Sequence, residues 1–193
     1  ILLLSIILLS GCSSFYPWHS VYNRNHTLVG KIWKTDEARF IDQDELVADI
    51  NNYDFVLLGE THNNPDHHIL QAYIIKSMVS RGRRPAVLFE MLNIGQEDAV
   101  TKFSKSYNKS SENFFKAINW KNSGWPDWKI YAPILDEVLD ANLQIVPANI
   151  SLQKIRRIMR LGREGLTPNQ IKRLQIEQTL PKRLQDLLKS EIQ

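Results

Sequence analysis

The sequence predicts an α/β fold, with a single domain built on a largely parallel sheet flanked by helices. Two short apolar runs, DFVLLG at 54–59 and RPAVLFEM at 84–91, have the composition of strands buried on both faces of a parallel sheet. The stretch between them has helical periodicity and is long enough to cross from one strand to the next. Strand, helix and strand in this order predict a right-handed βαβ unit.

The composition excludes some classes of protein. Hydrophobic residues make up 43% and charged residues 23% of the chain, which is ordinary for a globular domain. The formal net charge of +3 is too small to indicate a nucleic-acid partner. The sequence has no glycine-rich phosphate loop, so a nucleotide site is not expected either.

The N-terminus is typical of a secretory signal peptide. Its apolar run is too short to span a bilayer and ends in small residues before Cys12. The residues LSGC at 9–12 resemble a bacterial lipobox, so we expect residues 1–11 to be signal peptide and Cys12 to carry lipid. Cys12 is the only cysteine, and lipidation would explain an unpaired thiol in an exported protein. A plain signal peptide with an incidental cysteine is the alternative.

We expect the chain to be truncated at both ends. Neither an initiator Met nor a basic segment precedes the apolar run, and the helix-like stretch 166–193 ends without a Gly, Asn or Pro stop signal. The polar and aromatic residues 13–27 suit a tether between the lipid and an α/β domain at 28–193.

The first elements of the domain follow from local patterns. Residues 28–33 are predicted to form a strand, and residues 42–53 a short helix with acidic residues in its first turn, where the helix dipole favours them. Asn64 and Pro65 are predicted to be the N-cap and first position of a second helix, which ends at Gly82. Its predicted buried stripe comprises Ile69, Leu70, Tyr73, Ile74 and Met78.

The later elements continue the α/β pattern. A helix at about 130–141 is followed by a predicted strand at 144–148, and Asn149 comes directly after that strand. If the sheet is parallel, Asn149 lies at the same edge as the side chains that follow the other strands.

Charged and titratable side chains end the two strands of the predicted βαβ unit. Glu60 and His62 come directly after the first strand, and Glu90 ends the second. Because neighbouring parallel strands lie about 4.8 Å apart, we expect the three side chains to lie within about 8 Å of one another. His62 and Glu90 could then bind zinc, manganese or iron, or the three could act in hydrolysis. The alternative is that Glu60 caps the next helix and His62 bonds backbone in a turn.

Two further histidines begin the second helix. His67 and His68 lie in its first turn, where a positive charge is disfavoured, so a neutral imidazole is available there as a ligand or acceptor. We expect one of them to point to the site and the other to solvent.

An aromatic cluster lies further along the chain, in INWKNSGWPDWKIYAP at 118–133. Its members are Trp120, Trp125, Trp128 and Tyr131. Aromatic residues at this density usually form core. The functional alternative is a wall for a flat apolar ligand such as a porphyrin, with a tyrosine phenolate as axial donor to ferric haem. Gly124 and Pro126 predict a turn that holds Trp125 outward.

The motifs LLGETHNNPDHHILQ, RPAVLFEM, GWPDWKIYAPIL and VPAN, in this order behind a lipobox, resemble the ChaN-type haem-binding lipoproteins of the Tiki/TraB superfamily. The resemblance covers about residues 28–160. It implies an α/β domain, an outer-membrane lipid anchor on the periplasmic or surface side, and haem held between two protomers with tyrosine ligation.

The resemblance also assigns residues. The superfamily motif G-x-x-H falls on Gly59 and His62, with Glu60 between them, and its downstream glutamate falls on Glu90. In Tiki-like relatives these positions serve a metal-dependent protease, and erythromycin esterases carry a similar G-E-x-x-H. The family's later Gly-His strand does not occur in residues 1–193, so a metal site that needs its histidine would be incomplete.

Two functions of different classes follow. The favoured one is a lipid-anchored haem-binding protein of bacterial iron and haem uptake, which is expected to be a homodimer without catalytic activity. It is expected to bind ferric haem, and also a divalent metal ion if His62 and Glu90 converge. Tyr131 is the expected axial ligand, and the supporting residues are Trp125, Trp128, Glu60, His62, His67 and Glu90. The alternative is a metal-dependent hydrolase that uses Glu60, His62 and Glu90. The aromatic segment 120–131 favours haem, because a hydrolase does not need it.

Overall fold

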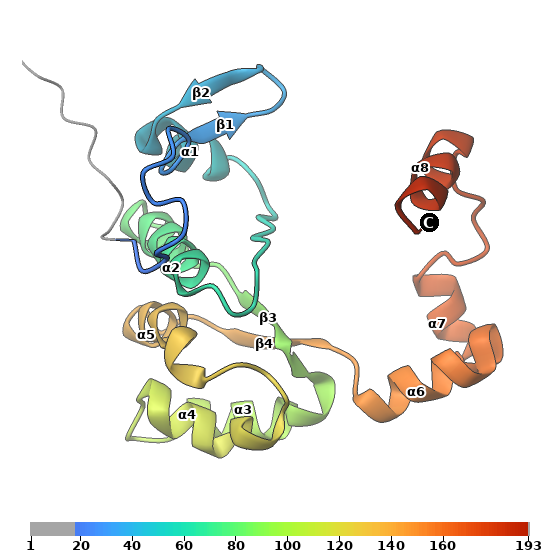
Figure 1. The fold of residues 1–193 in the computed structure, drawn as a ribbon. Coiled ribbons are helices and arrows are strands. Elements are labelled where there is room, and N and C mark those ends of the chain that lie inside the picture. The colour runs from blue at the N-terminus through green and yellow to red at the C-terminus, as the bar shows by residue number, and fades with distance from the viewer. Residues whose placement is uncertain (1–17, 193) are drawn as a thin grey trace, which may run out of the picture.

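A computed structural model describes residues 18–192 and shows a mixed α/β body from which a helical arm extends (Figure 1). Cys12, the predicted signal peptide and the first part of the predicted tether lie outside the described residues. Within residues 18–192, no helix is both long and apolar enough to cross a membrane.

The first elements of the described residues are a hairpin and two helices. Strands β1 (Ile32–Lys34) and β2 (Arg39–Ile41) pair antiparallel, and α1 (Gln43–Ile50) and α2 (Pro65–Ser80) follow. Between β3 (Val87–Asn93) and β4 (Ile145–Asn149) lie α3 (Glu97–Ser104), α4 (Ser111–Ala117) and α5 (Ala132–Asp140). The arm contains α6 (Leu152–Leu161), α7 (Pro168–Arg173) and α8 (Lys182–Ile192). Short 3-10 turns are η1 (Ile94–Gln96), η2 (Trp120–Asn122), η3 (Trp128–Ile130) and η4 (Gly162–Gly165).

The predicted helix starts are confirmed. The Asn64 side chain accepts a hydrogen bond from the Asp66 backbone N–H, and Pro65 occupies the first helical position of α2. The helix predicted at 42–53 corresponds to α1, whose N-cap Asp42 accepts from the Glu45 N–H. The helix predicted at about 130–141 and the strand predicted at 144–148 are likewise present, as α5 and β4.

The parallel sheet is confirmed, but its strands are not the predicted neighbours. β3 pairs in parallel with β4, with Phe89 opposite Pro147, and the crossover contains α3, α4 and α5. The predicted strand 54–59 is extended chain without ladder pairing, and the exposed fractions of Phe55 and Leu57 are 87% and 95%. The prediction of a strand buried there is therefore wrong, because an apolar run indicates a preference for burial but does not supply a neighbouring edge.

The sequence predicted that Glu90 ends its strand, but the structure shows a longer strand. β3 continues through Met91 and Leu92, which are both buried, to Asn93. Glu90 therefore lies inside the strand and is exposed to solvent. Only Asn149 ends its strand as predicted, and its Nδ2 donates to the Glu90 backbone oxygen at 3.0 Å.

The buried face of α2 also differs from the predicted stripe. Its buried residues are Asp66, His68, Ala72, Ile75 and Met78. Of the predicted stripe only Met78 is among them. Both stripes have spacings of three and four residues, and α2 is apolar on most sides, so periodicity alone could not choose between them. Tertiary packing selects the face that carries His68.

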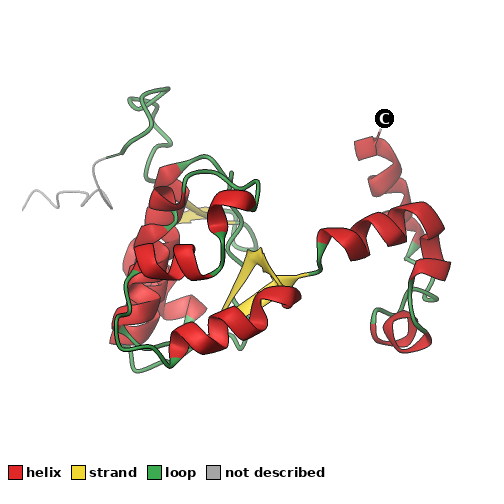
Figure 2. Ribbon diagram, turned by 90° about the horizontal axis from the view of Figure 1, so that it is seen from below, coloured by secondary structure: helices red, strands yellow, loops and turns green. Residues whose placement is uncertain are grey.

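The core lies where α2 and α5 pack together and extends over α3, α4 and the sheet (Figures 1 and 2). Tyr131, Leu135 and Val138 present one fully buried face of α5 and its first turn. Edge-to-face aromatic contacts continue the core from Phe114 through Phe115 to Trp120. The sequence's aromatic cluster is therefore largely core, apart from its outer tryptophans.

The arm projects from the body in both views (Figures 1 and 2). Helix α6 has no buried residue. Apolar side chains of the arm that are exposed include Leu152, Met159, Leu174, Leu184, Leu187 and Leu188. The stability of the fold therefore depends on the body, where the buried apolar residues are concentrated.

Replacing Leu135 by Ala tests this core. The side chain is fully buried in α5, so its truncation should lower the free energy of unfolding by about 2–5 kcal/mol. Urea unfolding followed by far-UV circular dichroism measures the change. The matched control, Leu187→Ala on the exposed side of α8, should change stability by no more than about 0.5 kcal/mol. Equal losses in the two variants would contradict this placement of the core.

Candidate functional site

A buried carboxylate lies at the end of the extended segment that leads into α2. The Glu60 side chain is only 8% exposed, and its Oε1 lies 2.8 Å from His62 Nδ1. Its Oε2 lies 3.2 Å from Nε2 of the fully buried His68. The Tyr131 hydroxyl donates to Glu60 Oε1 at 3.3 Å and to the His62 backbone oxygen at 3.1 Å. These four residues are called the Glu60 cluster below.

Backbone contacts hold the loop of the cluster against α2. The Gln71 side chain donates from Nε2 to the Leu58 backbone oxygen at 3.2 Å. The Thr61 N–H donates to His67 Nδ1 at 2.8 Å. Because Gln71 and His67 both lie on α2, the loop that carries Glu60 and His62 is attached to this helix at two points.

The environment shifts the pKa of the carboxylate and of its two buried neighbours. Burial alone would raise the pKa of Glu60, but the hydrogen bond with His62 outweighs it and lowers the pKa, together with the charge that His68 carries at the low pH where it is protonated. Burial lowers the pKa of His68, and the nearby Glu60 opposes that shift only partly. Burial and the Glu60 charge raise the pKa of the Tyr131 phenol. The cluster therefore favours an ionised Glu60, a neutral His68 and a neutral Tyr131.

The His68 ring packs against the Tyr131 ring at a tilt of 38°, with ring centroids 4.1 Å apart. Neither of its ring nitrogens makes a hydrogen bond of good geometry within the described part of the chain. Its approach to Glu60 at 3.2 Å is therefore an electrostatic contact rather than an aligned hydrogen bond. A buried imidazole held in this way responds to the protonation state of its neighbours.

One side of the Glu60 cluster is open to solvent. The His62 side chain is 43% exposed, whereas the other three members are nearly or fully buried. The His62 ring meets the half-buried Trp125 edge to face, with centroids 4.8 Å apart. An exposed imidazole beside an indole, above a buried carboxylate, is the feature of this site that a ligand can reach.

The N-terminal segment is attached next to the cluster. The buried carboxylate of Asp66 accepts from the backbone N–H groups of His19 and Ser20 at 2.7 and 2.8 Å. Asp66 lies in the first turn of α2, directly before His67. The end of the predicted tether is therefore fixed to the helix that carries part of the site.

The structure brings together some of the predicted site residues and not others. Glu60 and His62 are in contact as expected. Within residues 18–192 Glu90 makes no hydrogen bond or ion pair with either of them, although its charge contributes to the raised pKa of Tyr131. Trp128 packs on Phe115 with centroids 5.5 Å apart, which places it toward the core. The predicted roles of Glu90 and Trp128 in ligand binding remain predictions.

The site residues predicted from the sequence did not include His68, which the structure places in the Glu60 cluster. His67 was chosen in its place, but its Nδ1 is occupied by the Thr61 N–H. The pattern that could have identified His68 is its spacing from Ala72 and Ile75, which are both buried. As expected, one histidine of the pair points to the site, while the other is partly exposed.

The described residues contain no group of three or more His, Cys, Asp or Glu side chains arranged to hold a metal ion. Metal binding by His62 and Glu90 therefore remains a prediction.

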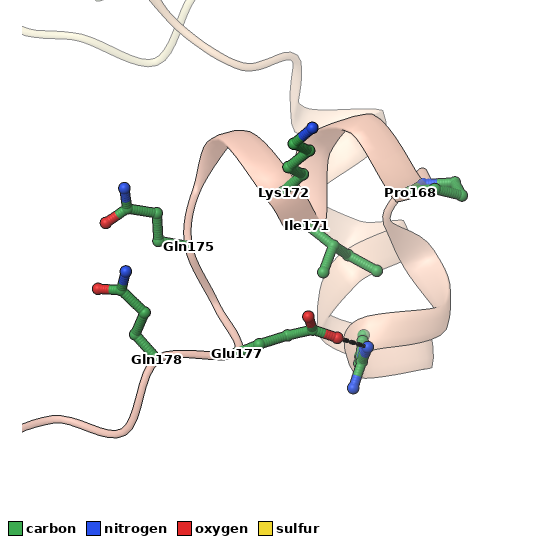
Figure 3. A pocket seen from close by; sticks show the side chains of 7 residues that line it. Pro168, Ile171, Lys172, Gln175, Glu177 and Gln178 are labelled. Carbon is green, nitrogen blue, oxygen red and sulfur yellow. Dashed lines mark hydrogen bonds and ion pairs between the residues drawn. The ribbon is translucent and has the colours of Figure 1, made fainter.

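A separate hollow lies in the arm, away from the Glu60 cluster (Figure 3). Its walls include Ile171, Lys172 and the ion pair between Arg163 and Glu177. Its lining contains no His, Tyr or Cys, the side chains that commonly bind haem iron. This hollow therefore does not compete with the cluster as a candidate cofactor site.

Comparisons with known proteins agree with the fold. A family model described as "Haem-binding uptake, Tiki superfamily, ChaN" matches residues 46–193. The solved structure "Cofacial heme binding to ChaN of Campylobacter jejuni" is similar, with a TM-score of 0.61 and 25% sequence identity. The similarity covers 69% of this chain and 53% of that one, so this chain spans about half the length of the solved relative. A comparison with curated proteins gave no match.

The lowered pKa of His68 predicts that the folded protein becomes less stable as the pH decreases. Because its pKa is lowered in the folded state, the unfolded chain binds a proton below about pH 6.5 that the folded chain does not. The stabilisation is complete above that pH and is lost at up to about 1.4 kcal/mol per unit as the pH falls below it. Urea unfolding of wild type at pH 7.5 and 5.5 measures the loss.

The matched variants are His68→Gln, which removes this group, and His19→Gln, which changes an exposed histidine. The difference in stability between the two pH values should shrink in the first variant and stay unchanged in the second. An equal pH dependence in wild type and His68→Gln would contradict the assignment.

Proposed function

Since the chain belongs to the haem-binding uptake family ChaN of the Tiki superfamily, we propose that it binds haem at the open side of the Glu60 cluster. The observation that carries this proposal is the exposed His62 imidazole beside Trp125. Haem iron commonly takes a histidine nitrogen as its axial ligand, and an indole provides an apolar surface for a porphyrin. Bound haem would supply an iron centre; the chain's own residues supply the donor and the wall.

The residues present fit a haem with His62 as the donor better than one with Tyr131. The Tyr131 hydroxyl is buried and already donates to Glu60 and to the His62 backbone. Its raised pKa also disfavours the phenolate that would bind ferric iron. Ligation by Tyr131 would therefore require the phenol to leave the core. Tyr131 supports the floor of the site, and His62 offers the accessible donor.

The wider role is that of a lipid-anchored carrier of ferric haem. A carboxylate that accepts from an imidazole increases the basicity of its other nitrogen, which favours ferric iron. The lipobox-like LSGC before Cys12 supports a lipid anchor at the outer membrane, on its periplasmic or surface side. The family description supports a role in uptake.

A homodimer fits this role. Haem has two faces, and one edge of a single domain covers only one of them. The solved relative is described as binding heme cofacially, which is consistent with enclosure by two protomers. The second face of the haem would then be covered by the same surface of another copy.

A hydrolase remains the second candidate, because one observation favours it. Glu60 and His62 lie 2.8 Å apart, which is the separation of a histidine base and the carboxylate that orients it. In this function His62 would activate water at the open side of the cluster, with a metal ion bound near Glu90. A protein that shows no haem absorption and hydrolyses a peptide or ester in a metal-dependent manner would support this function.

Titration with ferric haem tests the binding proposal. Wild type should develop a Soret band with saturable binding, and His62→Gln should bind at least about tenfold more weakly because the donor nitrogen is lost. His19→Gln, which changes an exposed histidine outside the cluster, should bind as wild type does. The comparison uses the absorption spectrum and the Kd of each variant.

Tyr131→Phe decides between the two candidate ligands. It removes only the phenol oxygen, so the spectrum should keep the wild-type band positions if His62 is the donor. Loss of the band in Tyr131→Phe with an unchanged spectrum in His62→Gln would make Tyr131 the ligand. No band in wild type would overturn haem binding at this site.

Substitution of Cys12 tests the anchor. In the full-length gene, Cys12→Ala should abolish lipidation and move the protein from the membrane fraction to the soluble fraction, because acyl chains contribute about 0.8 kcal/mol per buried CH₂ to membrane binding. Cell fractionation and mass spectrometry of the mature N-terminus measure both effects. An unmodified Cys12 thiol in the mature wild-type protein would refute the lipid anchor.

A further inference from the structure

We propose that residues 18–31, called the strap below, are fixed to the body through Asp66 and hold the exposed apolar side chains of the strap and the β1–β2 hairpin against a lipid bilayer. The proposal rests on the lipid anchor of the proposed function for the presence of the bilayer. The attachment of the strap to the body is a property of the chain alone.

A buried carboxylate attaches the strap to α2. Asp66 Oδ1 accepts from the His19 N–H at 2.7 Å, and Oδ2 accepts from the Ser20 N–H at 2.8 Å. Asp66 is only 5% exposed, so little water competes for these two bonds. Hydrogen bonds to a carboxylate are also roughly twice as strong as bonds between neutral groups. The strap is therefore held firmly at the first residues that the structure describes.

The strap is also folded on itself. The Arg24 side chain donates to the backbone oxygens of Trp18 and Ser20, at 2.7 and 3.1 Å. The Trp18 ring reaches Gly30, where an added Cβ would lie 3.6 Å from the indole. The start of the hairpin therefore lies beside the residues that Asp66 holds.

This attachment limits the distance between the body and the lipid. A chain spans at most about 3.6 Å per residue, so Trp18 lies no farther than about 22 Å from Cys12. A free tether over the predicted residues 13–27 would have allowed roughly 55 Å. The strap thus keeps the body next to the bilayer that holds the lipid of Cys12.

The side chains around the attachment point suit a bilayer interface. The exposed apolar residues here, called the N-terminal surface, are Val21, Tyr22, Leu28, Val29, Trp33 and Phe40. Trp33 and Phe40 pair across the hairpin and pack edge to face, with ring centroids 5.0 Å apart. Tyr and Trp are enriched where proteins meet lipid headgroups, because their rings are apolar and their polar atoms stay hydrated.

The position of the anchor selects the bilayer as the partner of this surface. Val21 and Tyr22 directly follow the two residues that Asp66 holds, and the hairpin begins close by. The exposed apolar residues of α6 and α8 lie on the arm, which projects away from the hairpin (Figure 1). A lipid on Cys12 therefore brings the N-terminal surface to the bilayer.

The first experiment measures amide exchange of the full chain in solution by NMR. The His19 and Ser20 N–H groups should exchange slowly in wild type and at least about tenfold faster in Asp66→Ala, because both acceptor atoms are lost. The amide of Leu135 in the core should keep its wild-type rate. Asp98→Ala, which removes an exposed carboxylate from the first turn of α3, should change none of these rates. Fast exchange at His19 and Ser20 in wild type would overturn the proposal.

His19→Pro breaks the attachment from the other side. It removes one donor N–H and leaves Asp66 and α2 unchanged. Ser20 should exchange faster in this variant, and Leu135 should not. If Asp66→Ala accelerates Leu135 as much as Ser20, and Ser20 keeps its wild-type rate in His19→Pro, Asp66 only stabilises the helix and the strap is refuted.

The second experiment places the lipidated protein in vesicles of phosphatidylethanolamine and phosphatidylglycerol with brominated acyl chains, which quench a dye that touches them. Cys12 is the only cysteine and its thiol is blocked by lipid, so a new cysteine carries the dye alone. Tyr22→Cys and Phe40→Cys should lose emission. Tyr107→Cys, between α3 and α4 at the opposite end of the body from the hairpin, should not (Figure 1). Adding Asp66→Ala should abolish the quenching at position 40.

Three results would overturn the bilayer contact. They are quenching at position 107 instead of 22 and 40, quenching at 40 that does not depend on Asp66, and shielding of 22 and 40 that grows with protein concentration without vesicles, which would make a second copy the partner. If Cys12 carries no lipid, the lipid anchor of the proposed function fails together with the bilayer contact, whereas amide exchange still decides the attachment of the strap.

Discussion

The organisation of this protein depends on one buried carboxylate. An ionised Glu60 removed from water costs several kcal/mol unless polar partners surround it. Those partners come from three places in the chain, namely the loop through His62, helix α2 through His68 and the start of α5 through Tyr131. Packing of α2 against α5 is therefore also what satisfies Glu60, and a shift of either helix would leave a buried charge without its contacts.

The same contacts join the hydrophobic core to the open site. Tyr131 packs on Trp120 within the core, with centroids 5.1 Å apart, and its hydroxyl donates to the carboxylate. On the other side of Glu60, His62 is exposed and touches Trp125. The site is consequently rigid where it meets the core and accessible at one imidazole, which is the arrangement needed to hold a ligand atom in a fixed direction.

Several surfaces away from the Glu60 cluster expose large apolar side chains. Phe55 and Leu57 are exposed in the extended segment, as is Leu88 on β3. The arm adds exposed apolar residues on α6 and α8. Extended apolar surfaces of this kind are typical of places where a protein meets another surface, whereas Glu60, His68 and Tyr131 are enclosed within the body.

The sequence by itself determined the elements whose signals are local. Asn64 and Pro65 define the start of α2, and Asn149 ends β4, because caps and strand ends depend on neighbouring residues. Family membership also followed from the order of short motifs, and residues 46–193 match that family. Only the tertiary structure decided which face of α2 is buried, which strand β3 pairs with, and that Tyr131 faces inward while His62 faces out. Each of these depends on contacts between segments far apart in the chain, which the pattern of apolar residues within one segment does not specify.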